Sequence, residues 1–99
     1  MAIARHVYIR LKSEHQSEAG RAALAEASRV LADVPGVESL SVLMPADKQA
    51  LDAWDACLVL RFATLEAVAG YREHPDHRRY VDDYLRERAA VLKAWNFEL

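Results

Sequence analysis

Alternation of apolar and polar residues predicts that the chain begins with a strand. Over residues 3–12 one face is aliphatic and the other is polar or aromatic: Ile3, Val7, Ile9 and Leu11 against His6, Tyr8, Arg10 and Lys12. A period of two with β-branched and aromatic side chains is typical of a strand. Similar patterns predict strands over residues 39–44, 54–62 and 89–99, and we expect Trp54 to share a face with Ala56 and Leu58.

Helical periodicity fills most of the intervals between these strands. The first helical pattern ends at Pro35-Gly36 and places four apolar side chains on one face: Leu24, Ala27, Leu31 and Val34. Thr64 is a suitable N-cap for a second helix over residues 64–73, and Pro75 suits the first turn of a third helix. Residues 45–52 are largely polar and are expected to form a loop.

The order strand, helix, strand, strand, helices, strand predicts an α+β fold. Two split βαβ halves in this order give the ferredoxin-like arrangement, a four-stranded antiparallel sheet with helices on one face. A chain of 99 residues fits one domain, residues 1–99. The other face of the sheet would be bare. Its simplest cover is the same face of a second copy, so we expect a homodimer.

Composition and charge narrow the range of partners. Thirteen Lys and Arg against fifteen Asp and Glu give a net charge of -2, so there is no basic excess for nucleic acid. No apolar run approaches the ~20 residues needed to cross a bilayer, and the N-terminus lacks a basic segment followed by an apolar one. We therefore expect no membrane association and a cytoplasmic location. Cys57 is the only cysteine and lies in an apolar run, which indicates a packed side chain rather than a reactive thiol.

Tyr71 and His77 are the candidate catalytic residues. His77 shares a helical stripe with Val81 and Tyr84, so its side chain is expected to face inward. An imidazole can take a proton from an acidic carbon, and a phenol can donate a hydrogen bond to the resulting enolate. The pair would support aldol-type ring closure or a related proton transfer, with no metal or organic cofactor. The alternative is that His77 anchors the helix and Tyr71 fills the core.

Two further histidines are candidate ligand-binding residues, His74 and His6. His74 and His77 are three residues apart on one helical face, a spacing that can suit a metal ion. A third ligand would have to come from His6 or Asp76, and no spacing enforces this, so no metal site is predicted. His74 is also expected to meet the free backbone groups at the start of a helix.

Four segments carry a resemblance to a known family. They are Tyr71-Arg72-Glu73-His74-Pro75-Asp76-His77, Val34-Pro35-Gly36-Val37, residues 54–62 and Trp95-Asn96-Phe97. Together they resemble the stress-responsive dimeric A/B barrel family over nearly the whole chain. The resemblance implies a ferredoxin-like fold and a homodimer whose two sheets close into a barrel.

The resemblance implies several classes of function rather than one. The family includes plant stress-induced proteins, bacterial members of unknown role and a plant polyketide cyclase. Similarity to that cyclase implies that Tyr71 and His77 act on a linear polyketide held between sheet and helices. The cyclase also has a first-strand histidine, five residues before a basic residue. Here Arg10 follows His6 by four residues, so alignment on the strand end puts Arg5 in that place, whereas a β-bulge would keep His6 there.

Two hypotheses therefore stand. In the first, the protein binds a small hydrophobic or phenolic molecule and acts on it as a cyclase-like or isomerase-like enzyme through Tyr71 and His77. In the second, it is a non-catalytic stress-responsive or structural dimer in which the same side chains only pack. A cavity of several hundred Å³ lined by both residues favours the first hypothesis, and a filled site favours the second.

Overall fold

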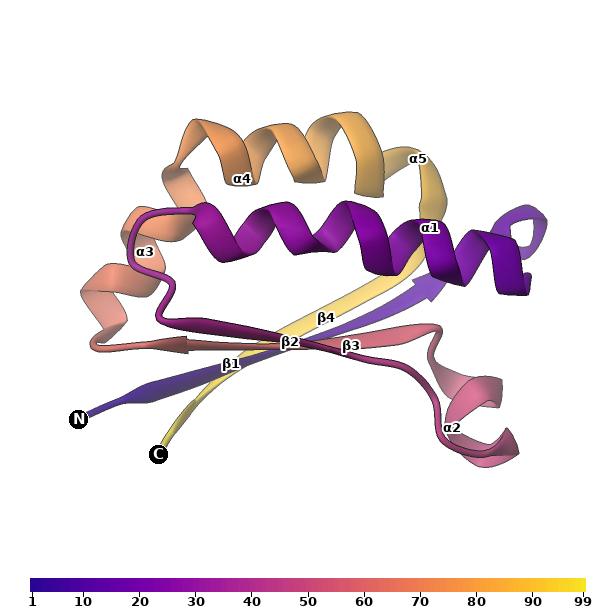
Figure 1. Ribbon diagram of the computed structural model, residues 1–99, viewed down its shortest axis with the longest axis horizontal. Helices are drawn as coiled ribbons and strands as arrows, with labels where there is room; N and C mark the ends of the chain where they lie inside the picture. Colours follow the sequence, from indigo (N-terminus) through magenta and orange to yellow (C-terminus); the bar gives the residue numbers. More distant parts are fainter.

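A four-stranded antiparallel sheet lies against a layer of helices in the computed structural model, which describes all 99 residues (Figure 1). The strands are β1 (Ile3–Leu11), β2 (Ser39–Leu43), β3 (Ala56–Phe62) and β4 (Ala89–Glu98). Their order in the sheet is β2-β3-β1-β4, so β1 pairs with both β3 and β4. This arrangement confirms the ferredoxin-like fold predicted from the order of the elements.

Two long helical segments cover one face of the sheet (Figure 1). The first is α1 (Glu18–Ser28), which follows the 3₁₀ turn η1 (Ser13–His15) and continues as the 3₁₀ turn η2 (Arg29–Asp33). The second is α4 (Pro75–Arg79), which continues as the π-helical segment η3 (Tyr80–Leu85) and ends with α5 (Arg86–Arg88). A separate helix, α3 (Leu65–Glu73), precedes α4 at one end of the sheet.

Local chemistry sets the helix boundaries. The Ser17 side chain accepts a hydrogen bond from the amide of Gly20 and starts α1, and Thr64 does the same for the amide of Ala67 at the start of α3. After η2 the chain turns at Gly36, whose φ of 97° lies in the left-handed region that glycine adopts without steric cost. The Thr64 cap and the stop at Pro35-Gly36 predicted from the sequence are confirmed here.

Strand register decides which side chains face the helices. Val7 lies opposite Leu58 and Ala94, and Ile9 lies opposite Ala56, so the aliphatic side of β1 continues across the sheet. The largest fully buried side chains come from strands and helices alike: Tyr71, Phe62, Ile9, Leu11, Leu24, Leu31, Leu58 and Leu60. This core fixes α3 and the following helix against the sheet and so positions the site described below.

Two local expectations are wrong. Residues 45–52, expected as a loop, include the start of a short helix, α2 (Lys48–Ala53), whose N-cap Asp47 accepts a hydrogen bond from the amide of Ala50. Trp54 does not share a face with Leu58, because its amide still bonds to the carbonyl of Ala50 and β3 begins only at Ala56. The Trp54 ring lies instead 5.4 Å from that of Tyr8, on the opposite face of the sheet.

We call the sheet surface away from the helices the open face. Its central side chains, as the register places them, are His6, Tyr8, Val59, Trp95 and Phe97. Trp95 is 51% exposed and Phe97 is 54% exposed, although both are large and apolar. The ring centroid of His6 lies 5.4 Å from that of Phe97. The bare face expected from the sequence is therefore present and is aromatic in character.

Candidate functional site

Tyr71 and His77 meet at the corner between α3 and α4. Tyr71 lies near the end of α3, and the chain then turns at His74 and Pro75 into α4, which carries His77. The two ring centroids are 4.4 Å apart and the rings are tilted by 51°. Tyr71 is only 1% exposed and also packs against Phe62, with the ring centroids 5.1 Å apart. The structure thus brings the two candidate catalytic side chains into direct contact.

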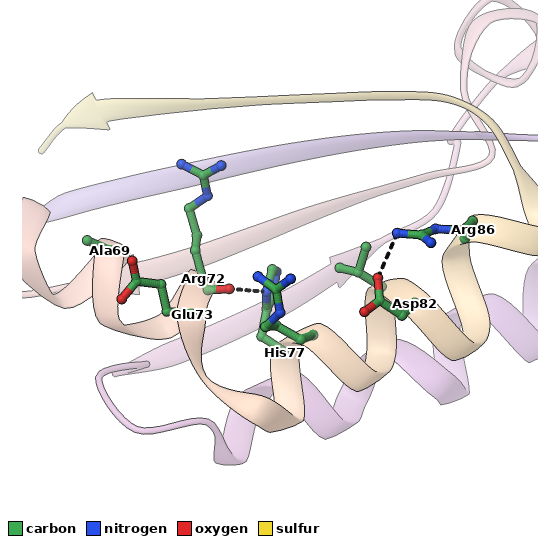
Figure 2. A pocket seen from close by; sticks show the side chains of 8 residues that line it. Ala69, Arg72, Glu73, His77, Asp82 and Arg86 are labelled. Carbon is green, nitrogen blue, oxygen red and sulfur yellow. Dashed lines mark hydrogen bonds and ion pairs between the residues drawn. The ribbon is translucent and has the colours of Figure 1, made fainter.

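His77 uses one ring nitrogen for the fold and keeps the other free. Its Nδ1 lies 3.0 Å from the carbonyl oxygen of Arg72 (Figure 2). Because a carbonyl only accepts, Nδ1 carries the proton and donates it to this bond. Burial lowers the pKa of His77, and the charges of Arg5, Arg72 and Arg78 lower it further, against the raising effect of the Arg72 hydrogen bond. His77 is therefore a neutral imidazole near neutral pH, with Nε2 able to accept a proton.

Tyr71 is suited to donate a hydrogen bond rather than to act as a base. Burial raises the pKa of Tyr71 well above its ordinary value, and the charge of Arg5 opposes this shift only in part. The phenol therefore stays protonated at physiological pH. No hydrogen bond within the chain occupies its hydroxyl, whereas the hydroxyl of Tyr80 is bonded to Ser28.

Arg5 reaches this corner from the sheet. It lies opposite Leu60 of β3 and Asn96 of β4, and so it shares the covered face with the aliphatic residues of β1. One guanidinium nitrogen, Nη1, donates a 2.9 Å hydrogen bond to Oδ1 of Asn96. The charge of Arg5 acts on both Tyr71 and His77. Of the two alternatives left open by the sequence, Arg5 is the first-strand residue beside the pair.

The other two candidate histidines lie elsewhere. His6 is on the open face, where its Nδ1 is 3.3 Å from the hydroxyl of Tyr8. The register between β1 and β4 shifts only after Arg10, where β4 carries the extra residue, Ala90, so no bulge between His6 and Arg10 turns His6 inward. His74 caps α4, because its Nδ1 accepts a hydrogen bond from the amide of Asp76 at 3.1 Å. The structure does not bring either residue to the wall of the groove that His77 lines.

A groove of about 490 Å³ opens beside His77 (Figure 2). Its lining is mainly charged and comes from the helices: Arg72, Glu73, His77, Arg78, Asp82 and Arg86. Tyr71 is absent from this lining, because Phe62 and His77 enclose its ring. The expected cavity lined by both Tyr71 and His77 is therefore not formed, and the hollow at this corner is polar rather than aromatic.

The sequence interpretation missed the arginines of this groove. Arg72 and Arg78 both line the groove, and neither forms an ion pair. Arg86, by contrast, is paired with Asp82 at 2.9 Å. The available signal was that Arg72 and Arg78 directly follow the two candidate catalytic residues in the sequence.

A second polar cluster, also missed, surrounds Asp55 just before β3. This carboxylate has no exposed surface, and its Oδ2 accepts a hydrogen bond from the amide of Leu11 at 2.8 Å. Arg10 and Arg21 place guanidinium nitrogens 3.6 Å and 3.5 Å from its two oxygens. Arg10, placed by the sequence pattern on the polar face of the first strand, thus serves to neutralise a buried acid.

No three His, Cys, Asp or Glu side chains converge closely enough to hold a metal ion. None of the helices has both the length and the apolar character needed to span a membrane. The polar side chains that line the groove are imidazole, guanidinium and carboxylate groups.

These features define a ferredoxin-like α+β domain with an uncovered aromatic sheet face and a charged groove at a helix corner. The sequence profile of the Stress Responsive A/B Barrel Domain matches residues 3–94. The chain belongs to this family. None of the curated proteins compared with it is significantly similar.

Several solved structures share the fold over nearly the whole chain. A Dabb family protein with a ferredoxin-like fold from Mesorhizobium loti has a TM-score of 0.81 and 21% identity, covering 99% of this chain and 96% of that one. A dimeric ferredoxin-like protein of unknown function from Thermobifida fusca has a TM-score of 0.80 and 20% identity, covering 100% and 92%. A protein from Nitrosomonas europaea, named provisionally as an antibiotic biosynthesis monooxygenase, has a TM-score of 0.76 and 19% identity, covering 99% and 89%. At these identities the likeness shows the fold alone.

Proposed function

We propose that this protein is a homodimer that binds a small organic molecule in the groove beside His77 and uses His77 as a proton acceptor. The observation that carries this proposal is the state of His77. Its Nδ1 is held by the Arg72 carbonyl, its Nε2 is free, and the ring lines the groove. A positioned neutral imidazole is the most common general base in proteins. The reaction class is a proton transfer that needs no organic cofactor, as in a cyclase-like ring closure or an isomerisation.

In this proposal Nε2 of His77 takes a proton from a carbon next to a carbonyl group. The negative charge moves to the carbonyl oxygen and forms an enolate. The enolate either attacks a second carbonyl of the same molecule, which closes a ring and leaves an alkoxide that takes the proton back from His77, or takes the proton back from His77 at another carbon, which isomerises the ligand. Tyr71 donates a hydrogen bond to the enolate oxygen once binding opens the packed corner, a role that its raised pKa suits.

Ligand binding is tested by following the Cε1–Hε1 resonances of the four histidines while titrating the protein with phenol and with acetylacetone. We expect the His77 resonance to move, while that of His15, which lies in η1 away from the groove, stays in place. His77→Phe should change the unfolding free energy by less than about 1 kcal/mol, because His77 is only half-buried.

A structural role is the second candidate, and the burial of Tyr71 favours it. Tyr71 is enclosed between Phe62 and His77, and the hydrogen bond from His77 to the Arg72 carbonyl ties the start of α4 to the end of α3. If this is the whole role of the pair, His77→Phe should lower the unfolding free energy by about 2 kcal/mol. In that case no probe should move the His77 resonance.

The homodimer is proposed to form through the open face. Exposed Trp95 and Phe97 form an aromatic patch that a second copy would cover, and the similar structure from Thermobifida fusca is described as dimeric. Sedimentation equilibrium at micromolar concentration should give twice the chain mass. Trp95→Glu should give a monomer, because it buries a charge in the contact. Leu65→Glu is the matched control, since Leu65 is 57% exposed but lies on α3. A monomeric wild type would contradict the proposal.

A further inference from the structure

We propose that the molecule bound beside His77 carries an anionic group, a carboxylate or an enolate oxygen, and that Arg5 and Arg72 hold this group. This inference rests on the proposed function and adds the chemical class of the ligand. It depends on where positive charge in the protein is neutralised and where it is left without a partner.

Most arginines of the chain have a carboxylate partner. Six of them lie 3.7 Å or less from an acidic oxygen: Arg10, Arg21, Arg29, Arg61, Arg79 and Arg86. Arg88 lies over the ring of Tyr84. The remaining three arginines, Arg5, Arg72 and Arg78, have neither an ion pair nor an aromatic partner, and these are the three whose charges act on His77. The arginines without a charged or aromatic partner are thus gathered at one place in the molecule.

The geometry leaves guanidinium donors available. Arg5 uses one N–H in its bond to Asn96, which fixes the side chain on the covered face of the sheet, and its other donors have no partner in the chain. Figure 2 shows Arg72 extending from α3 toward the strands, on the side of the groove that faces the sheet. A planar fork of N–H groups matches the two oxygens of a carboxylate. Arg72 lines the groove together with His77, whereas Arg5 lies behind this lining on the covered face of the sheet, where its charge still acts on His77. An anion bound beside His77 is therefore attracted by Arg72 from the groove wall and by Arg5 from the sheet.

The acidic residues of the groove do not neutralise this site. Asp82 is paired with Arg86 at 2.9 Å, at the far end of the groove from Arg72 (Figure 2). Glu73 forms no ion pair and points away from Arg72 in the same view. The positive charge that faces His77 is consequently available to a ligand, and a bound anion would cancel part of the field that disfavours protonated His77.

The test compares benzoate with benzamide, a neutral compound of nearly the same shape. Titrations at fixed ionic strength, followed through the His77 Cε1–Hε1 resonance, should show at least tenfold tighter binding of benzoate, and saturating benzoate should raise the pKa of His77. Arg5→Gln should reduce benzoate affinity at least tenfold and leave benzamide unaffected. Arg29→Gln removes the same charge at the end of α1, beside Glu26, and should change neither the benzoate affinity nor the benzamide affinity.

Arg72→Gln provides a second measurement, because Arg72 is exposed and its substitution does not disturb the core. It should weaken benzoate binding without changing the melting temperature. Equal binding of benzoate and benzamide would overturn the inference and leave the proposed function standing. Unchanged benzoate affinity in both arginine variants, or no binding of benzoate at all, would also overturn it. The proposed function itself fails only if phenol and acetylacetone also leave His77 unmoved.

Discussion

Two arginine clusters lie toward opposite ends of β1, and only one of them contains a carboxylate. Near Leu11, Asp55 has no exposed surface and lies within 3.6 Å of guanidinium nitrogens of Arg10 and Arg21. Near the start of the strand, the charge of Arg5 acts on a neutral His77, and no acidic side chain is paired with it.

The presence or absence of a carboxylate distinguishes a structural arginine cluster from one that can bind a ligand. A buried acid shared by two arginines and a backbone amide is a nearly satisfied network, and breaking it leaves buried charge without compensation. The second cluster, Arg5 and Arg72 beside His77, holds its positive charge at a cost in electrostatic free energy. Burial and the nearby charge of Arg72 both lower the pKa of Arg5. Perturbed groups in a hollow of the surface mark functional sites more often than structural ones. The first cluster therefore holds the fold together, and the second is arranged to receive a ligand.

Replacing Asp55 with Ala should have the largest effect. The change leaves two arginines and the Leu11 amide without their acceptor, so we expect the unfolding free energy to fall by about 3–5 kcal/mol. Urea denaturation at fixed protein concentration measures this loss. Asp52→Ala is the control, since Asp52 is exposed and pairs with Lys48 at 2.7 Å, and it should cost less than about 1 kcal/mol. Equal losses in the two variants would contradict the structural role of the first cluster.

Asn96→Asp should turn the second cluster into a copy of the first. Asn96 already accepts a hydrogen bond from Arg5, and Asp has nearly the same shape, so a carboxylate would face the guanidinium without rearrangement. We expect a gain of about 0.5–1 kcal/mol in unfolding free energy and the loss of benzoate binding, because the anion site is then filled from within.

The matched control for this change is Gln16→Glu. Gln16 accepts a hydrogen bond from Arg10 at 3.2 Å, but Arg10 already has Asp55 as its counter-ion. A new carboxylate there also loses the 2.7 Å hydrogen bond from Nε2 of Gln16 to the Leu11 carbonyl, so it should not raise the unfolding free energy, and it should leave benzoate binding intact. If Asn96→Asp changed neither stability nor binding, Arg5 would not be the unpaired charge that the structure indicates.

The pH dependence of stability should show the smallest effect. The pKa of His77 in the folded protein is lowered from its ordinary value of 6.5, so the unfolded chain takes up a proton more readily. The contribution of neutral His77 to the unfolding free energy is fully present above pH 6.5. It is lost as the pH falls from 6.5 toward the lowered pKa, because the unfolded chain then binds the proton first. Urea denaturation at pH 7.5 and pH 5.5 should show a smaller difference for His77→Phe than for the wild type. Identical differences would mean that the pKa of His77 is not lowered.

Individual residues show how much of the site could be predicted. The spacing of Tyr71 and His77 around a proline indicates two side chains on adjoining helical turns, and the structure brings them into contact. The alternation of β1 also contains the position of Arg5, because Arg5 lies at period two between Ile3 and Val7. No such signal exists for α2, whose six residues are too few to show an apolar period.

The sequence by itself determined the order of the strands, the helix caps and the bare face of the sheet, because these depend on residues a few positions apart. Only the tertiary structure decided which charges are neutralised. Asp55 reaches Arg21, and Arg5 reaches Asn96, through strand pairing and helix packing between segments distant in the chain. Coulomb interaction and burial depend on separation in space, so the difference between a structural and a ligand-binding arginine could not be seen before the chain was folded.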